Sequence, residues 1–351
     1  MFKLFGSNKV CGIDLGSKDI KIVEVEKYRN SFILNNYTII EIESSKSLSY
    51  ILDTSQIFEE TLAKILEKGL SYFKTKKIVF SVPPGYYIYT NFSLPFIPLN
   101  SLKNAINFEY KKYIPTAQEN FQIEWRNFQY SPSNIPGQDK WFIFLTAIPE
   151  SYVLKIKNVC DLIKAKCLKI IPEIFSLEWF FSKNNDLIAL VDIGYTSSYI
   201  VLIKEGKVIH SQKILTSTKN IIDVFQNIFS MDHEASEQLF KQKGFNILPE
   251  EYDLKKTIDE IIKDFSYQIL KIKNNWESFF GLKIGTIYFT GSLTMATGFL
   301  NKISDNIKEA EIKIFNPLEE IIKVNTNNIK NINKGSALVQ AIGACVKFFL
   351  D

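Results

Sequence analysis

The fold is decided by the stretch VCGIDLGSKDIKIVEV, residues 10–25. An apolar run ends at Asp14, a polar turn with Gly16 follows, and a second strand pattern runs from Ile20 to Val25, which predicts a β-hairpin. Glycine adopts positive φ and lets backbone N–H groups approach a phosphate, while the Asp14 carboxylate can face Mg²⁺ directly or through water. The hairpin is therefore a candidate phosphate-binding element.

The same arrangement occurs a second time at Asp192-Ile193-Gly194, where Asp192 ends the buried strand pattern over 187–192. A single Asp-x-Gly after a strand is also common as a plain hairpin turn. Each copy here is followed by an outgoing strand, over 20–25 and over 199–203. Two copies together predict two related lobes that hold one phosphate chain between them.

A third element completes the pattern. The strand over 284–289 leads through Thr290-Gly291-Ser292 to a helix over 297–307, which offers exposed backbone on which an adenosine can rest. This order of motifs resembles the superfamily of actin, sugar kinases and heat-shock ATPases, whose two lobes close on ATP. The resemblance implies an α/β, two-lobed actin-like (ribonuclease H-like) fold.

The segment between Pro83-Pro84-Gly85 and Pro149 predicts a separate α+β subdomain. It is rich in aromatic and β-branched residues, and its helix over 99–113 stops before Pro115, because proline disfavours helical backbone in the preceding residue. The expected domains are a first-lobe core and an insert, then a second lobe and a terminal helix that returns to the first lobe. Their bounds are 1–83 with 150–185 returning to it, 84–149, 186–333 and 334–351.

Other elements follow from periodicity. A strand is expected over 32–43 and helices over 55–73 and 253–280, the last long enough to cross a lobe. Small residues along 334–349 suit a helix packed closely against another backbone.

Within the superfamily the chain resembles the PilM family of type IV pilus assembly proteins. The most specific piece is Tyr113-Ile114-Pro115, in an insert that resembles those of PilM and of the division protein FtsA and that actin lacks. The resemblance covers nearly the whole chain. It is carried by Gly12 to Gly16 with Ile20 to Val25, Leu94-Pro95, Glu109, Tyr113 to Pro115, Val191 to Gly194, the Gly291 turn and the Gly343 helix.

The resemblance implies ATP with Mg²⁺ in the cleft between the lobes, and Asp14 and Asp192 as metal ligands, directly or through water. The expected nucleotide contacts are Gly12, Asp14, Gly16, Ser17, Lys18, Asp192, Gly194, Tyr195, Thr196, Ser197, Gly291, Ser292 and Gly343. The sequence departs from the family at two places. Tyr195 stands where a small residue is usual, and a lone Gly291 replaces a run of glycines, so weaker nucleotide binding is expected.

The resemblance also implies a partner. It implies capture of the cytoplasmic N-terminal tail of a PilN-like inner-membrane protein, contacts with other inner-membrane platform proteins of the pilus, and a cytoplasmic location peripheral to the inner membrane. The membrane is then reached only through partners. The tail is expected in a groove between first lobe and insert, near Tyr86, Tyr87 and Tyr89, which look exposed in the sequence; the alternative is that these tyrosines pack the insert.

Composition excludes several other classes. The net charge of +4 with scattered lysines predicts no nucleic-acid binding. Four cysteines without a CxxC pair and two histidines indicate neither a zinc site nor a disulfide framework. The start of the chain is too briefly apolar for a signal peptide, and the uncharged stretch over 284–301 is broken by glycines and threonines, which makes it poor material for a bilayer span.

For hydrolysis, the candidate to position water is Glu173, at the start of the helix that links the lobes, with Glu178 as a poorer one. Both are also ordinary acids for a helix N-terminus, so slow hydrolysis at most is expected. Three alternatives stand beside the scaffold: a small-molecule kinase, an FtsA-like division protein and a scaffold that has lost nucleotide. A kinase needs an acceptor-side Asp, and Asp161 lies in mid-helix; no C-terminal amphipathic anchor of the FtsA kind is recognisable.

Overall fold

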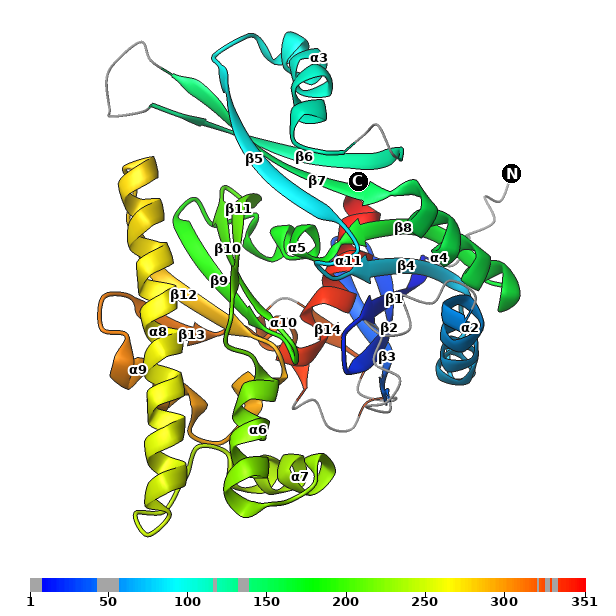
Figure 1. Cartoon of the computed structure of the whole chain (residues 1–351). Helices are drawn as coiled ribbons and strands as arrows, with labels where there is room; N and C mark the ends of the chain where they lie inside the picture. The colour runs from blue at the N-terminus through cyan, green and yellow to red at the C-terminus, as the bar shows by residue number, and fades with distance from the viewer. Residues whose placement is uncertain are drawn as a thin grey trace.

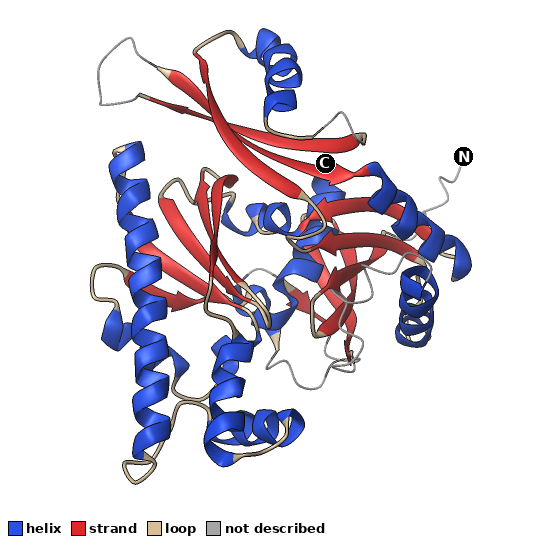
Figure 2. Cartoon of the chain, in the orientation of Figure 1, coloured by secondary structure: helices blue, strands red, loops and turns tan. Residues whose placement is uncertain are grey.

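The computed structural model describes residues 8–42, 57–115, 119–131, 139–320, 322–325, 329 and 334–351. Two lobes, each built on a sheet, stand side by side, and the insert lies across one end of both (Figures 1 and 2). Each lobe and the insert has its own apolar core. The ends of two predicted elements, residue 43 and residues 55 and 56, lie outside the described residues.

The first lobe carries a six-stranded sheet in the order β14-β3-β2-β1-β4-β8. Strands β1, β2 and β3 are antiparallel, which confirms the predicted hairpin, whereas β1, β4 and β8 are parallel. Helices α2 and α4 pack on each other, and α11 packs against β1, β2 and β4. The bounds are β1 Lys9–Leu15, β2 Asp19–Tyr28, β3 Ser31–Glu41, α2 Ile57–Leu70, β4 Lys77–Val82, α4 Glu150–Leu162, β8 Lys166–Pro172, β14 Lys323–Val324 and α11 Val339–Leu350.

One domain bound differs from the prediction. Strand β14 pairs in parallel with β3 of the first sheet, so the chain returns to the first lobe before residue 334. The two-residue strand lacks the length that makes a strand visible in sequence.

The second lobe repeats the plan of the first. Its sheet order is β11-β10-β9-β12-β13, with β9, β10 and β11 antiparallel and β9 parallel to β12. The long helix α8 lies along one side of the lobe (Figure 1). The bounds are β9 Leu187–Ile193, β10 Ser198–Lys204, β11 Lys207–Ile214, α6 Thr218–Phe229, α7 His233–Lys243, α8 Tyr252–Phe280, β12 Ile284–Thr290, α9 Phe299–Asn306, β13 Glu311–Ile314 and α10 Pro317–Glu320.

In its described residues the insert is a three-stranded sheet, β5-β7-β6, which carries the helix α3. Strand β7 continues directly into α4 of the first lobe, and the short helices α5 and η4 connect β8 to the second lobe. The bounds are β5 Ile88–Pro95, α3 Leu99–Glu109, β6 Phe121–Tyr130, β7 Lys140–Pro149, α5 Glu173–Ser176 and η4 Glu178–Phe181.

Glycines let α11 approach neighbouring backbone closely. A Cβ at Gly343 would lie 2.0 Å from the Ser176 carbonyl oxygen, and one at Gly12 would lie 2.1 Å from the Ala341 carbonyl oxygen. The predicted close packing of this helix is thus confirmed. It fixes α11 between β1 and the connecting helix α5.

We expect Gly343→Ala to lower the free energy of unfolding by about 1–3 kcal/mol, because the methyl group forces α11 away from backbone that cannot yield. Gly285→Ala is the matched control, since a Cβ there meets no atom within 4 Å. Urea unfolding measures both variants. If Gly343→Ala unfolded at the same urea concentration as wild type and Gly285→Ala, the contact between α11 and α5 would not be tight.

Candidate functional site

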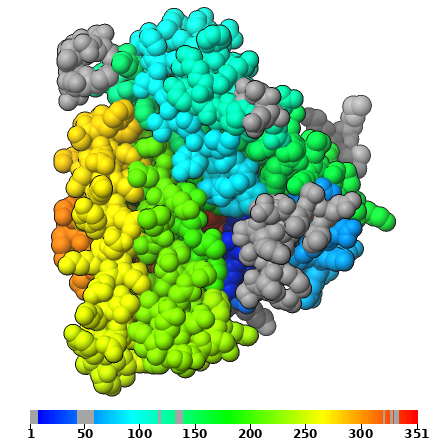
Figure 3. Space-filling model, in the orientation of Figure 1, coloured from blue at the N-terminus to red at the C-terminus, as the bar shows by residue number. Residues whose placement is uncertain are grey.

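A cavity of about 750 Å³ lies between the lobes, and both Asp-x-Gly turns line it. Strand β1 brings Asp14 to the cavity, and strand β9 brings Asp192 from the other lobe. In the space-filling view the second lobe and the blue first-lobe atoms meet along a seam (Figure 3). As predicted, the two Asp-x-Gly turns lie at one site.

Four acids and one lysine form the floor of the cavity. The Lys21 ammonium lies 3.2 Å from Asp14 Oδ2 and 2.6 Å from Asp19 Oδ1. Gln340 on α11 donates from Nε2 to Asp192 Oδ2 at 2.6 Å. Glu173, the first residue of α5, is buried beside them.

The pKa values of the carboxyl groups of Asp14, Asp192 and Glu173 are all raised. Burial raises the pKa of Asp14, although Lys21 counteracts part of this effect. Burial and then the neighbouring Asp14 raise the pKa of Asp192 to about 7. Burial, followed by Asp192 and Asp14, raises the pKa of Glu173 well above its usual range. A cation placed among these carboxylates would reduce the repulsion between them.

Removing the Asp192 charge should change how stability depends on pH. Between about pH 4 and pH 7 the folded chain holds a proton on Asp192 that the unfolded chain releases, so the free energy of unfolding falls as pH rises through this window. Asp192→Asn removes this loss and should be about 1–3 kcal/mol more stable than wild type at pH 8. Urea unfolding at pH 5 and pH 8 tests this, with the exposed Asp305→Asn as control; an unchanged pH slope would contradict it.

Most predicted site residues do line the cavity. Those it brings together are Asp14, Gly16, Ser17, Lys18, Glu173, Asp192, Gly194, Tyr195, Thr196, Ser197, Gly291 and Ser292. Gly12 and Gly343 do not line it. Their prediction as nucleotide contacts is wrong, because both serve the packing of α11.

The three glycine turns leave no room for side chains. A Cβ at Gly16 would lie 2.6 Å from the Asp19 carbonyl oxygen, and one at Gly194 would lie 2.4 Å from that of Ser197. Gly291 has φ 99° and a Cβ there would lie 2.3 Å from the Ile193 carbonyl oxygen. Three glycine turns, at Gly16, Gly194 and Gly291, therefore border one cavity without side chains at their glycines.

Several cavity residues escaped the sequence-based prediction. The Thr218 hydroxyl is buried without a hydrogen-bond partner, at the start of α6, and Thr218 lines the cavity. Lys21 stands opposite Asp14 in the β1–β2 register, so the predicted hairpin itself held the signal for it. Gln340 could not be found in this way, because it comes from the far end of the chain.

Ion pairs cross the mouth of the cleft. Lys18 on the first lobe pairs with Glu237 on α7, and its ammonium lies 5.0 Å from the centre of the Tyr195 ring. Lys241 lies 3.0 Å from Glu237 and 3.5 Å from Glu41 of the first lobe. The Tyr195 hydroxyl bonds to His233, so its ring turns toward α7 and forms a side wall.

The tyrosines predicted to line the partner groove, Tyr86, Tyr87 and Tyr89, do not form an exposed groove. Tyr86 and Tyr87 are 8% and 5% exposed, so the expectation that they are accessible is wrong. Tyr86 packs on Tyr152 of α4 with ring centres 4.5 Å apart and borders the nucleotide-type cavity, and Tyr89 is only partly exposed. All three pack in or against the core of the first lobe. The alternative that the sequence left open, packing within the insert, was right about packing but placed it in the wrong core.

A separate groove of about 510 Å³ does lie between the first lobe and the insert. It is bordered by β6 and β8, and each is the last strand of its sheet. Its lining includes Ile123, Ile148, Val153 and Leu168, with Lys157 and Lys169 among the polar residues. Unpaired strand edges beside apolar side chains are the chemistry that accepts an extended peptide.

The described residues hold no group of three or more His, Cys, Asp and Glu side chains placed to bind a metal by themselves. The donor set fits instead a divalent cation that brings phosphate oxygens with it: two carboxylates, glycine turns and an unpartnered hydroxyl. Within the described ranges, every helix is too short or too polar to cross a membrane.

These features define a protein of the actin-like ATPase fold, with a cavity between two related lobes. The chain belongs to the type IV pilus assembly protein PilM family, whose model matches residues 12–349.

Two solved structures show the same fold. The chain is similar to the "PilM-PilN type IV pilus biogenesis complex", with a TM-score of 0.75, 16% identity, and coverage of 97% of this chain and 98% of that one. It is also similar to the ethanolamine utilization protein EutJ from Carboxydothermus hydrogenoformans, with a TM-score of 0.51, 14% identity, and coverage of 99% and 92%.

Proposed function

We propose that this chain is an ATP-binding scaffold of type IV pilus assembly that captures the cytoplasmic N-terminal tail of a PilN-like inner-membrane protein. The observation that carries the nucleotide half is that Asp14 and Asp192, one from each lobe, line a single cavity with both glycine turns. Family membership and the likeness to a PilM-PilN complex support the partner half. In this proposal the chain works in the cytoplasm, reaches the inner membrane through its partners, and meets other platform proteins there.

In the cleft, ATP and Mg²⁺ would lie between the two turns. Backbone N–H groups of both turns and the Lys18 ammonium would contact phosphate oxygens, and the two Asp carboxylates would hold the Mg²⁺ directly or through water. Thr218 offers a further hydroxyl, and the Gly291 turn would carry the adenosine. Lys18 must exchange Glu237 for a phosphate, which supports the weaker affinity expected from Tyr195.

Hydrolysis would be slow or absent. Glu173 is the acid closest to the role of positioning water, but burial and then the neighbouring Asp192 and Asp14 raise its pKa well above its usual range. This disfavours the charged carboxylate that a general base needs. ATP then acts as a ligand that sets the angle between the lobes. This separates the proposal from a kinase, which must transfer the γ-phosphate.

The groove between β6 and β8 would hold the tail. An extended peptide can add to a strand edge through its main chain while alternate side chains enter apolar pockets, here between Ile123 and Leu168. The groove takes the place of the tyrosines as the proposed partner site.

The test is a titration of the chain onto a fluorescently labelled synthetic peptide with the N-terminal residues of the PilN protein from the same organism, read by anisotropy. Saturable binding is expected, with a scrambled peptide as control. Equal behaviour of the two peptides would remove the partner half of the proposal.

A further inference from the structure

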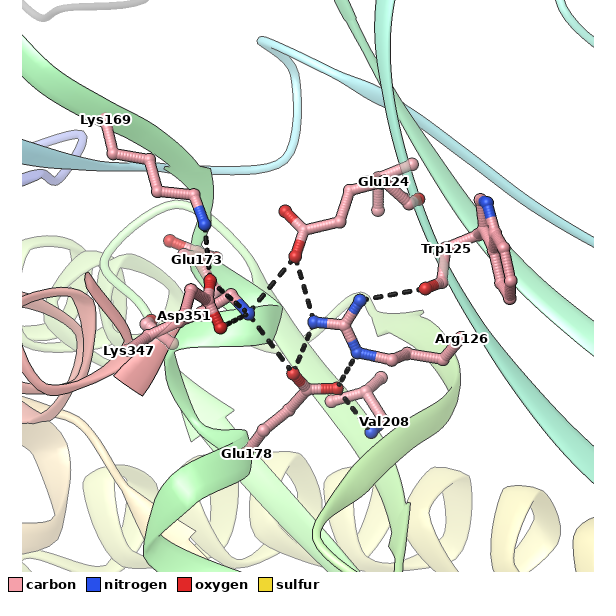
Figure 4. Close-up of polar contacts among 11 residues, drawn as sticks. Glu124, Trp125, Arg126, Lys169, Glu173, Glu178, Val208, Lys347 and Asp351 are labelled. Carbon is pink, nitrogen blue, oxygen red and sulfur yellow. Dashed lines mark hydrogen bonds and ion pairs between the residues drawn. The ribbon is translucent and has the colours of Figure 1, made fainter. Parts of the chain in front are cut away.

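Six charged side chains, which we name the junction cluster, connect separate parts of the chain (Figure 4). The Arg126 guanidinium on β6 binds the Glu178 carboxylate at two points, Nε to Oε1 at 2.7 Å and Nη2 to Oε2 at 2.6 Å. Arg126 also donates to Glu124 at 2.9 Å. The cluster consists of Glu124, Arg126, Lys169, Glu178, Lys347 and Asp351.

Glu178 is the centre of the cluster. It lies on η4, in the connection between the lobes, and accepts a hydrogen bond from the Val208 N–H of β11 in the second lobe at 3.0 Å. Lys347 of α11 lies 3.8 Å from Glu178 and 3.2 Å from Glu124. The insert, the second lobe and the terminal helix all contact this one carboxylate. A change in their relative positions would therefore change the contacts of Glu178.

The cluster reaches both proposed ligand sites. On one side, the Arg126 guanidinium lies 4.2 Å from the centre of the Phe175 ring, and Phe175 is two residues beyond Glu173 at the floor of the cleft. On the other side, Glu124 and Lys169 line the peptide groove. One short chain of contacts therefore runs from cleft to groove.

The insert is also held to the second lobe at another point. Tyr130 of β6 and Phe142 of β7 pack on the last turn of α8, with ring centres 5.3 Å from Phe279 and 5.2 Å from Phe280, respectively. The space-filling view shows the cyan insert resting on this lobe (Figure 3). A change in the angle between the lobes would therefore displace β6 relative to β8, the two strands that border the groove.

We infer that the Arg126–Glu178 pair links the two sites, so that nucleotide in the cleft changes the affinity of the groove for the peptide. The inference rests on the proposed function. A ligand that closes the lobes shifts the groove between two arrangements, and linkage requires that the peptide change nucleotide affinity by the same factor.

The experiment measures the Kd of the labelled PilN peptide with and without saturating ATP and Mg²⁺, and the Kd of ATP with and without peptide. For wild type we expect a factor of at least about 5 in both directions. Arg126→Lys keeps the charge but loses the two-point contact, and Glu178→Gln keeps an acceptor for Val208; both should bring the factor close to 1. Lys112→Gln, which removes an exposed ion pair with Glu109 in the same insert, should keep it.

The outcomes separate the two proposals. If wild type binds neither ligand, the proposed function fails and the inference fails with it. If both ligands bind independently, or if Arg126→Lys and Glu178→Gln retain the wild-type factor, only the inference is overturned. For each variant the compared quantity is the ratio of the Kd without the second ligand to the Kd with it. A general loss of affinity changes both Kd values and leaves this ratio unchanged.

Discussion

The variant Asp14→Asn with Asp192→Asn is expected to bind ATP in the presence of Mg²⁺ at least about 100-fold more weakly than wild type. Each carboxylate contributes a charged contact to the bound cation, and interactions of this kind are worth about 1.5–3 kcal/mol each. Isothermal titration calorimetry measures the change. The substitutions keep the shape of both side chains.

The control for this variant is its own stability. Burial raises the pKa of both carboxylates, with Asp19 adding to the rise at Asp14 and Asp14 to that at Asp192. Removing the two charges therefore relieves the folded state, so the double variant should unfold no earlier than wild type at pH 8. Lys21 retains its contact with Asp19. Unchanged affinity for ATP in a stable double variant would show that the nucleotide does not use the two turns.

The variant Ile123→Asp is expected to weaken capture of the PilN peptide by at least about 50-fold, because a carboxylate in an apolar pocket must lose its water when the peptide binds. Leu162→Asp is the matched control. Leu162 is 56% exposed on α4 and does not line the groove. Anisotropy titrations compare both variants with wild type.

Main-chain pairing in the groove can be tested in the peptide itself. If the tail adds to an edge strand, N-methyl groups at alternate residues should abolish binding in one register and be tolerated in the other, because successive N–H groups of a strand point in opposite directions. Equal tolerance of both patterns would restrict recognition to side chains.

For the substitutions in the protein, loss of peptide binding by the control Leu162→Asp as well as by Ile123→Asp would mean that the groove is not the site.

Local pattern predicted much of this molecule. Helix α8 was expected over 253–280 and runs over Tyr252–Phe280, because its apolar periodicity is long and unbroken. The β1–β2 hairpin and both Asp turns were also predicted, since strand, acid and glycine are adjacent in the sequence. The actin-like fold class that they indicated is confirmed.

What escaped prediction depends on contacts between distant residues. Tyr86 is buried because Tyr152, far along the chain, covers it, and no spacing around Tyr86 reveals that partner. The peptide-type groove exists because the edges of two different sheets face it, which is a property of topology and not of β6 or β8 alone. Gly343 was rightly expected to pack closely, but its neighbour is Ser176 and not a nucleotide.

If the two acidic turns hold one nucleotide between them, a crystal structure of the chain with Mg²⁺ and a non-hydrolysable ATP analogue will show it. We expect the triphosphate between the turns at Gly16 and Gly194, with Mg²⁺ facing Asp14 and Asp192. An analogue bound elsewhere, or a cleft left empty at saturating concentration, would contradict it.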